Sequence, residues 1–172
     1  MGFPTDRSAV VRRLGERADE PATAAGVVGT TALAFSGLYY GNMVLGHWGS
    51  VAAGEYEAVA GLTALFLLTV TNAAVVTWLV WSSRDLSDEW GYRRGAATGL
   101  LVGVASHLTL GLVVVAWSLL AGRASMTTGL SAVPSYFLIV FASVVFTAGV
   151  PLVLSVGSAL ALTHCRKRVR AD

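Results

Sequence analysis

The chain has 172 residues, of which 55% are hydrophobic and 13% are charged, and its mean hydropathy is +0.66. A composition this apolar excludes an ordinary soluble domain of the same length, so we expect an integral membrane protein. The formal net charge is only +2, but the charges are segregated. Long blocks without Asp, Glu, Lys or Arg run over about 24–46, 58–81, 96–121 and 134–163.

Each of these blocks is long enough for the ~20 residues with which a helix crosses the hydrocarbon core of a bilayer. We therefore expect an all-α, polytopic membrane protein whose four spans form an up-down bundle within one domain, residues 23–165. A basic N-terminal segment, residues 1–22, and a basic tail, residues 166–172, flank this domain.

The N-terminal segment carries Val10, Val11, Leu14 and Ala18 near one face of a helix, with arginines around the rest. This pattern fits a short interfacial helix. It fits a basic tail that only sets the topology equally well, because the apolar face is small and Gly15 weakens a helix. The charge-free block that follows is longer than the about 7–15 residues of a signal-peptide core, so we expect a retained first span.

The first span contains Gly37 and Gly41, a GxxxG pair at which another helix, such as the third span, can approach closely. Tyr39, Tyr40 and Asn42 lie in the half of the span that approaches the far surface, where polar groups need partners or water. We expect these side chains to form hydrogen bonds between helices. Contact with a substrate is the alternative.

The second span is punctuated by threonines, whose hydroxyls can bond back to their own helix. The amide of Asn72 cannot be satisfied as easily by a bond to its own helix. Because it lies close to mid-depth in the span, we expect its amide to face another helix.

The third span is the element around which we expect the other helices to pack. Glycine recurs at every fourth position and is replaced once by histidine, so that one ridge carries Gly95, Gly99, Gly103, His107 and Gly111. Absent side chains let another helix approach this ridge. His107 would then lie in the contact.

His107 lies roughly 16 Å from the start of its charge-free block, close to the midplane of a ~30 Å core. Burial without a counter-charge favours the neutral imidazole. In the fourth block, Pro151 has no N–H and therefore frees the carbonyl of Thr147 at a similar depth. A hydrogen bond from His107 to this carbonyl, with Asn72 or Ser106 nearby, would be purely structural. Alternatively, His107 lines a wet cavity and takes part in proton or solute passage.

The fourth block has 30 residues, more than a perpendicular crossing needs, so it must tilt, kink or extend into the cytoplasm. Pro151 predicts a bend within it.

The basic residues predict the orientation of the bundle. Eleven of the twelve Lys and Arg residues fall in the N-terminal segment, the loop 82–94 and the tail, and only Arg123 falls on the other side. The positive-inside rule then places both termini in the cytoplasm, and Trp and Tyr residues near the ends of the spans agree with these edges. The preference for Arg over Lys and the richness in Ala, Gly and Val indicate a prokaryotic genome, and hence the cell membrane.

Nothing in the sequence indicates an enzyme, since it has no GxSxG elbow, HExxH motif or Walker loop. A bis-histidine haem needs two imidazoles at one depth, but His47 and His164 lie at opposite edges. The outer-loop residues His47, Glu55 and Glu57 match no metal-ligand spacing, and the lone Cys165 excludes an internal disulfide. We expect no cofactor, no metal and no nucleic-acid partner.

We therefore expect a non-enzymatic helix-packing subunit or scaffold, which packs through glycine-rich faces with itself or within a larger complex in the lipid bilayer. The alternative is a small transporter or channel in which His107, Asn72 and neighbouring polar residues line a path for a solute or protons.

Overall fold

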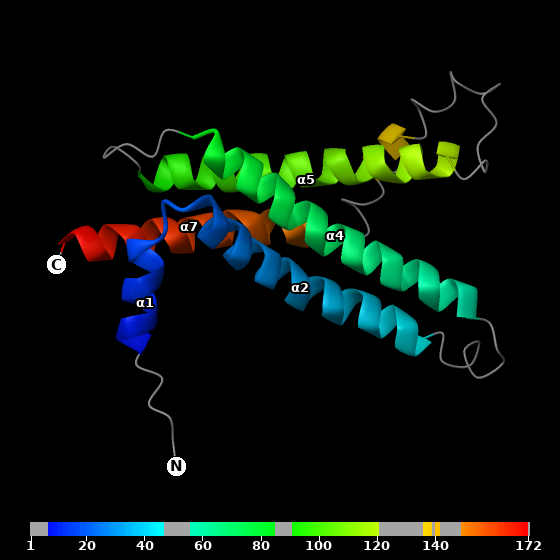
Figure 1. The fold of residues 1–172 in the computed structure, drawn as a ribbon, viewed down its shortest axis with the longest axis horizontal. Helices are drawn as coiled ribbons and strands as arrows, with labels where there is room; N and C mark the ends of the chain where they lie inside the picture. Colours follow the sequence, from blue (N-terminus) through cyan, green and yellow to red (C-terminus); the bar gives the residue numbers. More distant parts are fainter. Residues whose placement is uncertain are drawn as a thin grey trace, which may run out of the picture.

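The computed structural model describes residues 7–46, 56–84, 91–120, 136–138, 140–141 and 149–171, which form helices and turns and no strand (Figure 1). The expected all-helical class is confirmed. The long elements are α1 (Arg7–Glu16), α2 (Pro21–Gly46), α4 (Tyr56–Ser82), α5 (Tyr92–Leu120) and α7 (Val150–Ala171).

Three of these helices contain stretches that are long and apolar enough to cross a membrane: Pro21–Met43, Thr63–Ser82 and Tyr92–Ala116. They correspond to the first three charge-free blocks of the sequence. Because so large a share of this chain lies in such stretches, it is a membrane protein with a helical bundle.

The fourth charge-free block, 134–163, differs from the other three. Only its two ends lie within the described residues, and α7 begins at Val150, directly after Gly149, which has a positive φ of 67°. This left-handed conformation interrupts a helix and costs glycine little. Pro151 then stands in the first turn of α7, where a missing N–H breaks no helical bond, so the expected interruption lies just before the proline.

The helices pack as two pairs, α2 with α4 and α5 with α7. Smaller contacts of α4 with α5 and of α2 with α7 join the pairs. In Figure 1 the α2–α4 pair slopes away from the α5–α7 pair with distance from α1, so the two pairs diverge toward the other end of the bundle. Helix α1 lies across the C-terminal half of α7.

The buried core lies at the end where the pairs converge. Trp81 is only 3% exposed and its Nε1 donates a hydrogen bond of 3.0 Å to the carbonyl of Ala18. Arg166, at 4% exposure, pairs through Nε with Oδ1 of Asp19 at 2.7 Å. These contacts tie the turn after α1 to α4 and α7. Within the described part of the N-terminal segment, α1 is therefore a helix that docks on the bundle.

The ridge of α5 lies against other helices along its length. Three of its glycines face α7 and the fourth faces the short helical stretch near residue 140: Gly95, Gly99 and Gly103, then Gly111. A methyl group on Gly99 would lie 2.6 Å from Cα of Val156, closer than carbon atoms approach each other. The backbones of α5 and α7 are thus adjacent because side chains are absent here.

The expected contact between the GxxxG pair of α2 and this ridge is not formed. No described atom lies within 4 Å of the place that a Cβ would take on Gly37 or Gly41. α2 instead packs on α4, where Gly29 faces the Cβ of Ala74 at 3.4 Å, and α7 takes the place on the ridge.

Candidate functional site: a cavity between four helices

A cavity of about 170 Å³ lies among α2, α4, α5 and α7. Each helix contributes polar side chains to its wall: Thr31, Ser36, Tyr39 and Tyr40 from α2, Thr69 and Asn72 from α4, Ser106 and His107 from α5, and Ser155 and Ser158 from α7. Carbon atoms still make up most of the wall, with Phe35, Leu110 and Leu154 among its apolar members.

Four residues singled out by sequence come together here: His107, Asn72, Tyr39 and Tyr40. Asn42 is not among the residues that line the cavity and is exposed near the end of α2. Thr147 lies outside the described residues, so its expected hydrogen bond with His107 stays a prediction.

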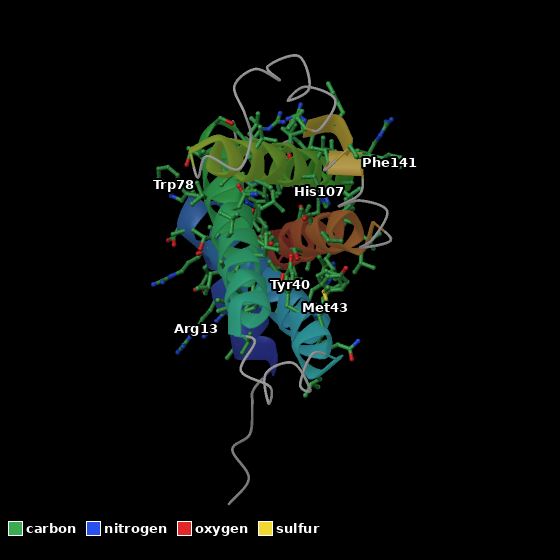
Figure 2. The ribbon with its side chains drawn as sticks, turned by 90° about the vertical axis from the view of Figure 1, so that its right-hand side faces the viewer. Arg13, Tyr40, Met43, Trp78, His107 and Phe141 are labelled. Carbon is green, nitrogen blue, oxygen red and sulfur yellow. The ribbon has the colours of Figure 1, made fainter. Side chains whose placement is uncertain are left out.

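His107 occupies the position of the ridge between Gly103 and Gly111. Because Gly103 faces α7 and Gly111 faces Tyr136 and Val140, the imidazole projects into the space where α7 begins (Figure 2). The side chain is buried, with 8% of its surface exposed, and it forms part of the cavity wall. An imidazole in this place can donate or accept a hydrogen bond and can carry a proton.

Asn72 connects α4 to α5 through both ends of its amide. Its Nδ2 donates to the carbonyl of Ser106 at 2.8 Å, and its Oδ1 accepts from Oγ1 of Thr109, also at 2.8 Å. The same hydroxyl lies 2.8 Å from the carbonyl of Ala105. These bonds hold the segment that carries Ser106 and His107 in place.

Aromatic rings of α2 form one side of the wall. Phe35 stacks on Tyr39 with ring centroids 5.9 Å apart, and Tyr39 meets the edge of Tyr40 at 5.3 Å. Tyr40 in turn approaches Phe66 of α4 at 6.5 Å. In Figure 2, Tyr40 lies on the α2–α4 side of the bundle and His107 on the α5–α7 side.

The wall hydroxyls differ in whether they are already hydrogen-bonded. Ser155 donates to the carbonyl of Pro151 and Thr69 to that of Leu65, at 2.8 and 2.7 Å, while Thr31 and Ser158 lie 3.3 Å apart as a hydrogen-bonded pair. By contrast, Oγ of Ser106 is buried and has no partner within the described part of the chain. A buried hydroxyl in this condition is an open position for a ligand or water.

Sequence reasoning missed most of the α2 wall. Ala32, Phe35, Ser36, Tyr39 and Tyr40 follow a spacing of i, i+3, i+4, i+7 and i+8, which is one face of a helix. Extending the helical period backward from the two tyrosines would have found this face. Ser155 and Ser158 carried no comparable signal, because serines in apolar helices usually bond to their own backbone.

The described side chains of this site can bind a molecule non-covalently and can exchange a proton at His107. Among the described residues, no three His, Cys, Asp or Glu side chains are grouped to hold a metal ion. Comparison of the chain with protein-family models, with curated proteins and with solved structures finds no match in any of the three.

Proposed function

We propose that this chain is a small membrane transporter or channel in which the cavity beside His107 holds a solute, or relays protons, on the way across the bilayer. The observation that supports this proposal is the position of the cavity among all four long helices, with polar side chains from each. Ionisable and polar groups at such depth are costly, and in membrane proteins they mark pathways for solutes and ions.

The interruption before α7 also favours passage over a purely structural bundle. Gly149 breaks the helical conformation, and the first turns of α7 contribute Pro151, Leu154 and Ser155 to the cavity. Many transporters bind their substrates near the midplane, where a helix is discontinuous.

The orientation that we propose places both termini in the cytoplasm of a prokaryotic cell. It is supported by the sequence count of basic residues and by their grouping in the fold. The exposed arginines of α1, Arg93 and Arg94 of α5, and the basic end of α7 belong to the end of the bundle at which α1 docks.

Proton flux into proteoliposomes tests this function. Vesicles that contain the wild-type chain should dissipate an imposed pH gradient faster than empty vesicles, and the rate should depend on pH. His107→Gln keeps a hydrogen-bond donor of similar size but does not titrate, so it should abolish that dependence. Thr71→Val, on the exposed side of α4, is the control and should leave the flux unchanged. Wild-type vesicles no leakier than empty ones would contradict the proposal.

A second function, that of a helix-packing subunit or scaffold, is favoured by the open GxxxG pair of α2. Because Gly37 and Gly41 meet no described atom, their surface remains available to a helix of another chain. The double variant Gly37→Leu/Gly41→Leu should then lower the oligomeric mass in mild detergent. An unchanged mass, or a wild-type chain that is already monomeric, would argue against self-association through this face.

A further inference from the structure

We infer that the cavity binds a neutral, ring-sized amphipathic molecule, with an apolar body and one hydrogen-bonding group directed at the hydroxyl of Ser106, beside His107. This inference rests on the proposed function, because it names the class of solute that the same cavity would hold. Its support comes from the size of the cavity, the absence of charged side chains among its described lining residues, and the buried hydroxyl of Ser106, which has no described partner.

The size of the cavity limits the ligand to about one ring. Its volume of about 170 Å³ is close to that of engineered apolar cavities of about 150 Å³, which stay dry and bind benzene. A six-membered ring with one or two small substituents fits this space. A sugar dimer or a nucleotide would extend beyond this volume.

The wall disfavours charged ligands. No Asp, Glu, Lys or Arg is among the described residues that line the cavity, so an ion there would be stripped of water without a counter-charge. The first N–H groups of α7 do not offer an anion a substitute for this counter-charge. Those of Leu152 and Val153 already bond to the carbonyl of Gly149, at 3.0 and 3.2 Å, and Pro151 has no N–H. The ligand is therefore neutral.

The open hydrogen-bonding position lies on α5. The backbone carbonyl of Ser106 already accepts from Asn72, whereas its hydroxyl is buried without a described partner and stands beside the imidazole of His107. A hydroxyl or carbonyl on the ligand would satisfy Ser106 Oγ. The rings of Phe35 and Tyr39 offer an apolar surface for the rest of the molecule.

The test uses 4-fluorophenol as the probe and the purified full-length chain in mild detergent, observed by ¹⁹F NMR. We expect saturable binding of one probe per chain above the linear partition into detergent. Two probes of similar size, the anion 4-fluorobenzoate and the cation 4-fluorobenzylammonium, should bind at least tenfold more weakly. Binding of either ion as tight as that of the phenol would overturn the inference.

Cavity-filling variants locate the binding. Ser36→Leu on α2 and Thr69→Leu on α4 place a larger side chain in the wall and should weaken binding at least tenfold. Their matched controls, Ala34→Leu and Thr71→Leu, lie on exposed positions of the same helices and should bind like the wild type. Equal binding by a filled and a control variant would place the probe elsewhere and overturn the inference.

Ser106→Ala provides a test that does not depend on filling the cavity. It removes one oxygen, leaves the carbonyl bond to Asn72 in place, and should keep the fold, as judged by its circular dichroism and melting temperature. We expect about a fivefold loss of affinity for 4-fluorophenol. No loss in a folded variant would overturn the assignment of the hydrogen-bonding group.

Different results would contradict the proposed ligand class and the proposed transport function. If His107-dependent proton flux is present but no neutral ring compound binds saturably, the solute class is wrong and the proposed function stands. If 4-fluorophenol binds in the cavity but neither proton flux nor its His107 dependence is seen, the binding site stands and the proposed transport is wrong.

Discussion

At the scale of single residues, Asn72 joins α4 to α5 through hydrogen bonds. Its amide both donates to and accepts from α5, through the carbonyl of Ser106 and the hydroxyl of Thr109. Hydrogen bonds between helices in membranes contribute only about 0.6 kcal/mol each on average, because the separated helices find other partners. Asn72 therefore contributes more to the position of Ser106 and His107 than to overall stability.

We predict that Asn72→Leu lowers the free energy of unfolding by about 1 kcal/mol. For a chain of this size this corresponds to a fall in melting temperature of about 2–4 °C in detergent. Thr71→Val removes a neighbouring hydroxyl from the exposed side of the helix and should not change the melting temperature. A loss of more than 10 °C with Asn72→Leu would show that the amide is essential for the fold, contrary to this account.

At the scale of elements, the contact of α5 with α7 depends on the absence of side chains at the ridge. A Cβ on Gly99 would lie 2.6 Å from Cα of Val156, and backbone atoms cannot give way as a flexible side chain does. Gly157 of α7, by contrast, has no described atom near the place of its Cβ.

Gly99→Leu should therefore destabilise the bundle by about 1–3 kcal/mol or more, since it forces two backbones apart. Gly157→Leu adds the same side chain to α7 at an open position. Its effect on the free energy of unfolding should be a few tenths of a kcal/mol, which corresponds to a change of about 1 °C in the melting temperature. Thermal unfolding followed by circular dichroism measures both. Equal melting temperatures for the two variants would mean that the ridge is not a tight contact.

The docking of α1 on α7 depends on a similar close approach at Gly15. A Cβ there would overlap the carbonyl of Cys165 and approach Cγ2 of Val169 at 2.5 Å. Cys165 is itself buried, and its burial raises the pKa of the thiol. With a raised pKa, the reactive thiolate appears only at a higher pH than in an exposed cysteine.

Alkylation of Cys165 by a maleimide reports whether α1 is docked. In the wild type the reaction should be slow at pH 7 and should accelerate at a higher pH than that of a free cysteine. Gly15→Leu should displace α1, raise the rate at pH 7 at least tenfold and return its pH dependence to the ordinary range. Val10→Leu, at a position with 53% exposure, should react like the wild type. An unchanged rate in Gly15→Leu would contradict the docked arrangement.

The elements were predictable from sequence to different degrees. The first three spans follow directly from the charge-free blocks, because charged residues are excluded from hydrocarbon and so mark the ends of the helices. The fourth block has the same composition, yet Gly149 adopts a left-handed conformation inside it. A glycine permits that conformation but does not require it, so Pro151 predicted a bend in this block whereas the residue at which α7 begins was not predictable.

At the scale of the whole molecule, the choice of partners was not predictable. The spacing of glycines marks the face of α5 that another helix covers, but it does not say that α7 rather than the Gly37–Gly41 face of α2 covers it. The cavity was not predictable for the same reason. It exists because the α2–α4 and α5–α7 pairs diverge, which depends on contacts between residues far apart in the sequence. His107, Asn72, Tyr39 and Tyr40 were nevertheless identifiable, since a polar side chain within an apolar helix needs an interior to face.

Successive long helices run in opposite directions, and this arrangement leads to a prediction about the orientation of the whole chain. The start of α2, the end of α4, the start of α5 and the end of α7 lie at the same end of the bundle, together with α1 (Figure 1). At that end Tyr92 contacts His164 at 3.1 Å, and Lys167 lies 4.7 Å from the centre of the Tyr92 ring. This end carries the basic segments, and the positive-inside rule therefore assigns it to the cytoplasm.

A reporter fused after Asp172, or inserted near Asp88, should accordingly be active only in the cytoplasm. A cysteine introduced at Gly54, in a chain with Cys165→Ser, should react with a membrane-impermeant maleimide added to intact cells. Because eleven of the twelve basic residues fall in segments that are predicted to face the cytoplasm, replacing a single arginine should not change this outcome. A cysteine introduced at Asp88 serves as the matched control and should not react. Labelling at Asp88 but not at Gly54 would invert the topology, and labelling at both would show that the bundle inserts in two orientations.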